Sequence, residues 1–243
     1  MGISAKKLVY DFRRKFNSVN SGRNQDIALV DVIAYLNEAQ EIWFENRVFV
    51  AQTNDKVRND LRVFKKDKVK LSIAPYGDGA ILAKYPPDLY KRLNQLIVAT
   101  KSCCPEIKKE IIPRIIQSDD LHEARHNPFR RSDFFFEQLN AIETVDGLVL
   151  YHDNEFEITD IYIDYYRRPG EIHAPTLEEC EGDVYYDYAG RIITKDQDFE
   201  VDATYAVNEV VDISILKASR DVSDVQGMQS QINLILSTQD LHK

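Results

Sequence analysis

One short string in this sequence has the residue types and the spacing to carry catalysis. It is His122-Glu123-Ala124-Arg125-His126. It matches the HExxH pattern, in which two histidines one helical turn apart bind zinc and the glutamate acts as a general base. The chain has only five histidines, which makes a chance match uncommon. A zinc-dependent hydrolase that uses His122, Glu123 and His126 is therefore one hypothesis for the function.

The residues around this string argue against a metal site. Pro128 follows almost at once and favours ending the helix at the second histidine, so the helix would have hardly two turns. Arg125 would place a cation beside the metal. Phe129 stands where the extended HExxHxxGxxH form needs a glycine, and nothing marks Glu143 as a third ligand. We therefore expect a short exposed helix, and no metal, cofactor or catalytic residue.

The other residues that could do chemistry form weaker patterns. No glycine-rich phosphate loop and no GxSxG nucleophile turn occurs. Cys103 and Cys104 are adjacent, which predicts reduced thiols rather than a disulfide framework or a thiolate zinc site. Arginines at 130–131 and phenylalanines at 134–136 are mixed as in proteins that bind single-stranded nucleic acid. A buried aromatic strand with a solvated basic start would give the same pattern, so a nucleic-acid-binding module is a further alternative.

The elements that must position these residues are helices at both ends of the chain. Near the N-terminus, apolar residues at three- and four-residue spacing predict helices over about 4–16 and 26–50, and a third that begins near residue 54. Towards the C-terminus an apolar stripe predicts a helix from about residue 203. A capping-box pattern at 223–226 predicts a last helix after it.

Between the helical ends the apolar period changes to two, which is typical of half-buried strands. A turn at 75–79 predicts a hairpin. The acidic segment 171–200 is irregular, apart from one hairpin expected near 189–190. The predicted strands lie at 68–73, 81–85, 93–100, 111–116, 148–152 and 156–168.

These elements predict an α+β fold in which both chain ends form a helical bundle and an antiparallel β-rich domain is inserted between them. The bundle domain would comprise residues 1–65 plus 202–243, and the inserted domain residues 66–201. No apolar run approaches the roughly 20 residues that span a bilayer. The start of the chain also lacks the apolar core of a signal peptide. We therefore expect a soluble protein that is made inside the cell and has no membrane contact.

Charge is distributed unevenly along the chain, whose formal net charge is −9. Residues 1–70 carry 14 Lys/Arg against 9 Asp/Glu, a net of +5. Residues 153–202 carry 15 Asp/Glu against 4 Lys/Arg, a net of −11. Segments of opposite sign on different faces would make the protein electrostatically two-sided, with one face that meets a complementary partner or repels a polyanion. Simple solvation of loops would explain the same charges.

Several short segments of the chain match a known arrangement. Leu36-Asn37-Glu38-Ala39 lies in the long helix, Pro87-Asp88-Leu89 precedes a predicted strand, the tyrosine-rich segment 163–169 ends in proline, and a helix pair follows from Asp202. Together they resemble the head-to-tail connector, or adaptor, ring proteins of tailed phages. The similarity is to the tail-tubular type found in podovirus-like and crAss-like phages, and it covers nearly the whole chain as an arrangement of elements.

The resemblance implies a structural virion protein rather than an enzyme. Such proteins form a ring, usually of twelve copies, below the portal at the phage vertex, and the genome passes through the lumen. The implied partners are other copies of the chain, the portal protein, further tail or ring proteins, and DNA that is not bound sequence-specifically. The implied location is the virion, after synthesis in the host bacterial cytoplasm. An acidic lumen would let DNA slide by repulsion, so we expect segment 153–202 to face the channel or a basic neighbouring ring.

A ring needs large contacts between its copies, and surplus apolar surface could supply them. The long helix carries more apolar residues than one neighbouring element would cover, and the tyrosine-rich strand is apolar on both faces. The last helix could serve here or against the portal. The interface residues expected from these elements are Leu29, Leu36, Trp43, Tyr165, Tyr166, Met228, Ile232 and Ile235.

Overall fold

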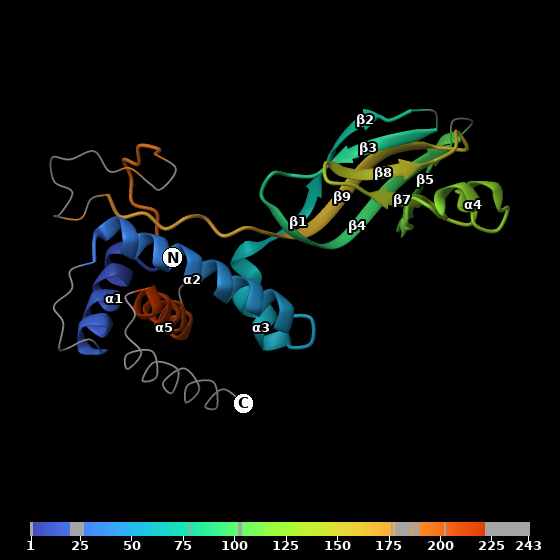
Figure 1. Cartoon of the computed structure of the whole chain (residues 1–243). Coiled ribbons are helices and arrows are strands. Elements are labelled where there is room, and N and C mark those ends of the chain that lie inside the picture. The colour runs from blue at the N-terminus through green and yellow to red at the C-terminus, as the bar shows by residue number, and fades with distance from the viewer. Residues whose placement is uncertain are drawn as a thin grey trace. The chain divides into compact units, whose positions relative to one another are not determined.

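The computed structural model describes residues 2–19, 27–77, 79–101, 104–175, 177, 186, 190–201 and 203–221. It is an α+β protein with two β-sheets (Figure 1). The chain divides into a helical unit, Met1–Val63 with Pro169–Lys243, and a β unit, Phe64–Arg168. Within the described residues, no helix has the length and apolar character needed to cross a membrane.

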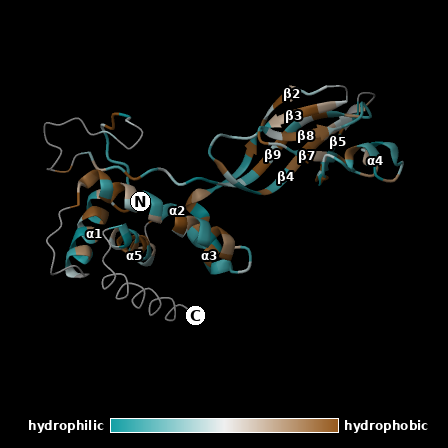
Figure 2. Ribbon diagram, viewed as in Figure 1, coloured by the Kyte–Doolittle hydropathy of each residue, from teal (hydrophilic) through white to brown (hydrophobic). Residues whose placement is uncertain are grey.

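The helical unit is built on α1 (Ala5–Val19), α2 (Leu29–Val50) and α5 (Thr204–Asp221), which pack against one another in all three pairs. Figure 2 shows hydrophobic residues in brown alternating with hydrophilic residues in teal along these helices. α3 (Asp55–Asp60) begins where predicted, because the Asn54 side chain accepts a hydrogen bond from the Lys56 amide and caps it. A 3-10 turn, η1 (Leu61–Phe64), follows.

The prediction that both chain ends form a helical bundle is not supported. α5 is the only helix described after residue 201. The predicted last helix, with its capping box at 223–226, lies outside the described residues. The stripe predicted for this helix was Ala203, Ala206, Val210 and Ile213; in α5 Ile215 is buried, and Ile213 is only partly covered.

Residues 169–201 belong to the helical unit, although they were expected in the β-rich domain. Ile172 is held within this unit, because the Asn37 side chain of α2 hydrogen-bonds both its N–H and its C=O. An isolated antiparallel bridge joins Ile3 to Phe199, and another joins His173 to Gln197. The hairpin expected near 189–190 falls mostly outside the described residues, but Tyr186 and Ile192 form an antiparallel bridge on either side of it.

The β unit holds two sheets that share one hydrophobic core. The first sheet has the order β1-β9-β4-β5, and its ladders are all antiparallel. The second has the order β2-β3-β8-β7-β6, in which only the β6–β7 pair is parallel. The strands are β1 (Lys65–Lys70), β2 (Ser72–Pro75), β3 (Ala80–Lys84), β4 (Leu89–Lys101), β5 (Cys104–Ile111), β6 (Arg114–Ile115), β7 (Asn140–Glu143), β8 (Gly147–Tyr151) and β9 (Glu157–Arg167).

Two strand predictions are wrong in their bounds. The strand expected at 68–73 is two strands in different sheets, separated at Leu71, which is buried and donates its N–H to the Ile161 carbonyl. The strand expected at 111–116 is also divided, because Pro113 has no N–H to give to a ladder. Most of the strand pairing in this region is made by β5. Its four charged residues obscure the alternation of polar and apolar side chains. The 75–79 hairpin, by contrast, is confirmed by the β2–β3 pair.

Candidate functional site

The HExxH string forms a short helix, α4 (Leu121–His126), in the β unit. The helix ends at His126, as predicted from Pro128, and Asn127 is already extended. The two imidazole rings are stacked with their centroids 4.2 Å apart. One nitrogen of the second ring, His126 Nδ1, hydrogen-bonds the His122 carbonyl at 2.8 Å. Both histidines are exposed, so the pair lies on the surface and not in a cleft.

The other charged groups of the string are engaged with protein partners. The Glu123 carboxylate forms an ion pair with Arg130 at 2.9 Å, where a hydrolase would need it as a base. The Arg125 guanidinium pairs with Asp153 at 2.6 Å and lies over the Tyr151 ring. Among the described residues, no three His, Cys, Asp or Glu side chains are grouped to hold a metal ion. The string therefore has two candidate ligands and no third.

Glu143, which could be proposed as a distant third ligand, already has protein partners. Its carboxylate accepts hydrogen bonds from the Arg92 guanidinium and the Tyr85 hydroxyl, both at 3.1 Å. Burial raises the pKa of the Tyr85 phenol to about 12; Arg92 opposes this shift and Glu143 adds to it. The hydrogen bonds among Tyr85, Arg92 and Glu143 connect the end of β3 with β4 and β7 of the β unit.

The expected interface residues of the long helix are placed inside the helical unit. Leu29, Leu36 and Trp43 are all buried in the chain's own core. The Trp43 indole is 2% exposed, meets the Phe199 ring edge-on at 5.9 Å between centroids, and donates its N–H to Glu209 of α5 at 2.7 Å. These side chains leave no surface for a second copy. Met228, Ile232 and Ile235 lie outside the described residues.

Around Trp43 lies a half-buried charge network that sequence patterns did not reveal. Arg47 contacts both carboxylate oxygens of Glu209, at 2.6 and 2.7 Å, and lies between the rings of Trp43 and Tyr205. It also approaches Asp60 at 3.7 Å. Burial, followed by the hydrogen bond to Asp60, raises the pKa of the Tyr205 phenol. The network joins α2, α3 and α5, so its role in the helical unit is structural.

The two tyrosines expected at an interface lie in β9 and are buried in the β unit. The Tyr165 hydroxyl donates to Asp88 at 2.9 Å, and Lys66 forms an ion pair with the same carboxylate at 2.8 Å. Burial opposes ionisation of Asp88, but the hydrogen bonds from Lys66 and Tyr165 outweigh it and lower the pKa of the carboxyl. The Pro87-Asp88 motif and the tyrosine-rich strand are thus in direct contact, although they are 77 residues apart.

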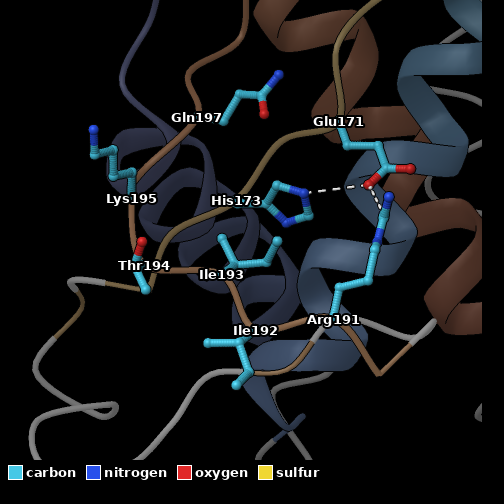
Figure 3. A pocket seen from close by; sticks show the side chains of 8 residues that line it. All are labelled: Glu171, His173, Arg191, Ile192, Ile193, Thr194, Lys195 and Gln197. Carbon is cyan, nitrogen blue, oxygen red and sulfur yellow. Dashed lines mark hydrogen bonds and ion pairs between the residues drawn. The ribbon is translucent and has the colours of Figure 1, made fainter.

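An open hollow of about 530 Å³ lies in the helical unit, beside the bridge between His173 and Gln197. Figure 3 shows the Glu171 carboxylate between the ring of His173, at 3.3 Å, and the guanidinium of Arg191, at 2.6 Å. Two of the groups there that could bind an anion, His173 and Arg191, are therefore turned to a carboxylate of the chain, and Lys195 is the third such group in the lining.

The phenylalanines at 134–136 correct the expectation of a buried aromatic strand. They lie in a tight turn, which we call the aromatic loop (133–138), closed by an isolated bridge between Asp133 and Gln138. Phe134 is 5% exposed and packs in the core, whereas Phe135 is 69% and Phe136 77% exposed. Periodicity could not find this arrangement, because a turn has none.

The comparison with protein-family models finds none that matches this chain, and the comparison with curated proteins finds no match either. The chain is therefore interpreted from its own residues and geometry.

Proposed function

We propose that this chain is a structural subunit of a ring at the portal vertex of a tailed phage, where it connects the portal to the tail and lets DNA pass. The observation that carries the proposal is the distribution of apolar side chains. Phe49 on α2, Ile112 just after β5, and Phe135 and Phe136 in the aromatic loop are all exposed. A subunit that is covered by its neighbours accounts for such a surface, since exposed apolar patches commonly mark interaction sites.

The segments that carry the resemblance to phage adaptors have structural roles, which fits a scaffold. Leu36 and Ala39 are buried on α2, which packs on α5. Asp88 and Tyr165 link β9 to the segment before β4.

The acidic stretch 153–202 extends through both units, because the division falls between Arg168 and Pro169. Under the proposal, this stretch faces the channel or a basic neighbouring ring. An electron cryomicroscopy map that places the whole stretch on the outer solvent surface contradicts this role.

Native mass spectrometry of the purified chain, alone and mixed with the portal protein, tests the proposal. We expect a closed oligomer, commonly of twelve copies, in at least the mixture with the portal. A monomer in both samples contradicts it. Stoichiometric zinc that is lost in a His122→Ala variant would favour the hydrolase instead, and salt-dependent DNA binding by a monomer at micromolar affinity would favour a nucleic-acid-binding module.

A further inference from the structure

We propose that the aromatic loop (133–138) of one copy binds the outer face of α2 in the next copy. This contact names the two surfaces that would join neighbours, and so it rests on the proposed ring. Its occupant is a second copy of this chain, and the argument for it comes from the order, the exposure and the charge of the two surfaces.

The aromatic loop is held in one shape before any partner arrives. Asp133 and Gln138 exchange both backbone hydrogen bonds, at 2.8 and 2.9 Å. The Asp133 carboxylate accepts from the N–H groups of Phe135 and Phe136, at 2.7 and 3.1 Å. Glu137 completes the turn in the left-handed region, with φ of 56°. A loop fixed in this way loses little conformational entropy on binding.

A cation accompanies the two exposed rings. The Lys101 ammonium lies 4.3 Å from the centre of the Phe135 ring, and Lys109 donates to the Phe135 carbonyl at 3.0 Å. Lys109 is also paired with Glu137. Within the described residues, Lys101 has no carboxylate partner. The loop therefore offers apolar surface together with one available positive charge, and a partner of matching chemistry would present apolar surface with a carboxylate.

The outer face of α2 has that matching chemistry. Glu41, Glu45 and Phe49 are four residues apart and lie along one side of the helix, all exposed, with Phe49 at 75%. Neither glutamate has an ion-pair partner among the described residues. Two like charges at this spacing repel one another. A cation from a neighbouring copy would relieve this repulsion while aromatic rings cover Phe49.

The two surfaces differ from each other and occur in the same chain. A contact between unlike surfaces of identical copies is heterologous, and such contacts close into rings when the rotation permits. Aromatic side chains are also enriched among the residues that dominate binding energy at interfaces. The aromatic loop would therefore be the anchor of a larger contact, whose polar rim contributes less.

Photo-crosslinking from Phe136→p-benzoylphenylalanine tests the contact directly. The chain is assembled from equal parts of unlabelled copies and copies labelled with ¹⁵N, so that crosslinks between copies carry both isotopes. We expect mixed-isotope crosslinks to peptides from residues 38–53. Crosslinks confined to the same copy, to the portal or to DNA overturn the proposal.

Charge reversal gives a second, independent readout. Lys101→Glu and Glu45→Lys should each weaken self-association about fivefold, the effect of an exposed ion pair, and the double variant should recover most of the loss. Lys84→Glu, an exposed reversal elsewhere in the β unit, is the matched control and should leave association unchanged. Equal loss in Lys84→Glu, or no recovery in the double variant, overturns the pairing.

One set of variants distinguishes an error in the proposed contact from an error in the proposed ring. Phe135→Ser with Phe136→Ser should abolish assembly while the circular dichroism of the monomer stays that of the wild type; Val145→Ser, a fully exposed apolar residue in another turn, should not. If the wild type and the double serine variant both form rings, the contact is wrong and the proposed function stands. A wild type that stays monomeric with the portal contradicts both.

Discussion

In the helical unit, charged side chains join elements that are far apart in the sequence, whereas in the β unit backbone ladders do most of that joining. Arg47 and Glu209 connect α2 to α5, and Lys15 with the buried Asp212 connects α1 to α5. In the β unit, β9 is paired with β4 along its whole length and with β1 over Tyr162–Tyr166. Helices satisfy their backbone internally, so their packing depends on side chains alone.

The comparison predicts that single side-chain changes damage the helical unit most. Trp43→Ala removes a buried indole, its hydrogen bond to Glu209 and its contact with Phe199. We expect the free energy of unfolding of the helical unit to fall by about 3–5 kcal/mol. Trp43 is the only tryptophan, so urea denaturation should be followed by circular dichroism.

The matched control for this change is Phe49→Ala, since Phe49 is an exposed aromatic residue on the same helix. Its effect on the monomer should stay within about 0.5 kcal/mol. Equal losses in the two variants would show that the core of the helical unit lies elsewhere.

A smaller effect is expected from Lys15→Met, which leaves the Asp212 carboxylate without its ammonium partner at 2.8 Å. Breaking a largely buried pair is costly, but Lys15 is partly exposed, so we expect a loss of about 2 kcal/mol. Arg14→Met, next to it in the sequence, breaks an exposed pair with Asp11 and should cost about 0.5 kcal/mol or less. Thermal unfolding of both variants measures the difference, and a ranking in the reverse order would refute the role of Asp212.

The smallest effect appears only at alkaline pH and compares one phenol from each unit. Burial, assisted by Asp221, raises the pKa of Tyr35 to about 12, and burial raises that of Tyr85 to the same value. The unfolded phenol has a pKa near 10. A raised folded-state pKa contributes stability that is complete below about pH 10 and is lost as pH rises towards 12.

The measurement is denaturant unfolding at pH 9 and pH 11 in Tyr35→Phe and Tyr85→Phe. Each variant should lose less stability between these two values than the wild type does, because it has no proton to release there. An unchanged pH dependence in either variant would mean that the corresponding phenol titrates normally in the folded state.

The sequence predicted those elements whose apolar pattern is long and regular. α1 and α2 and strands β4, β8 and β9 lie close to their predicted positions, since each has a clear apolar pattern; in β8 this pattern is a continuous buried run. Pro128 correctly predicted the end of α4. The middle of the chain was harder: β5 has charged residues along its exposed face, and β7 is only four residues long.

The candidate site was predictable only in part, for physical reasons. Leu36 and Trp43 were recognised as important apolar residues, but whether such a residue faces its own core or another copy is not encoded in its spacing. The run Phe134 to Phe136 was recognised in the sequence, but the turn that it forms in the aromatic loop was not predicted. Its shape is set by the Asp133–Gln138 bridge, which no spacing pattern in the sequence indicates.

The most direct measurement of the central claim is an electron cryomicroscopy map of this chain assembled with the portal protein. We predict a closed ring of identical subunits that is coaxial with the portal channel, with the aromatic loop of each copy against α2 of its neighbour. A single copy bound to the side of the portal, or a map in which no two copies touch, would contradict the proposed function.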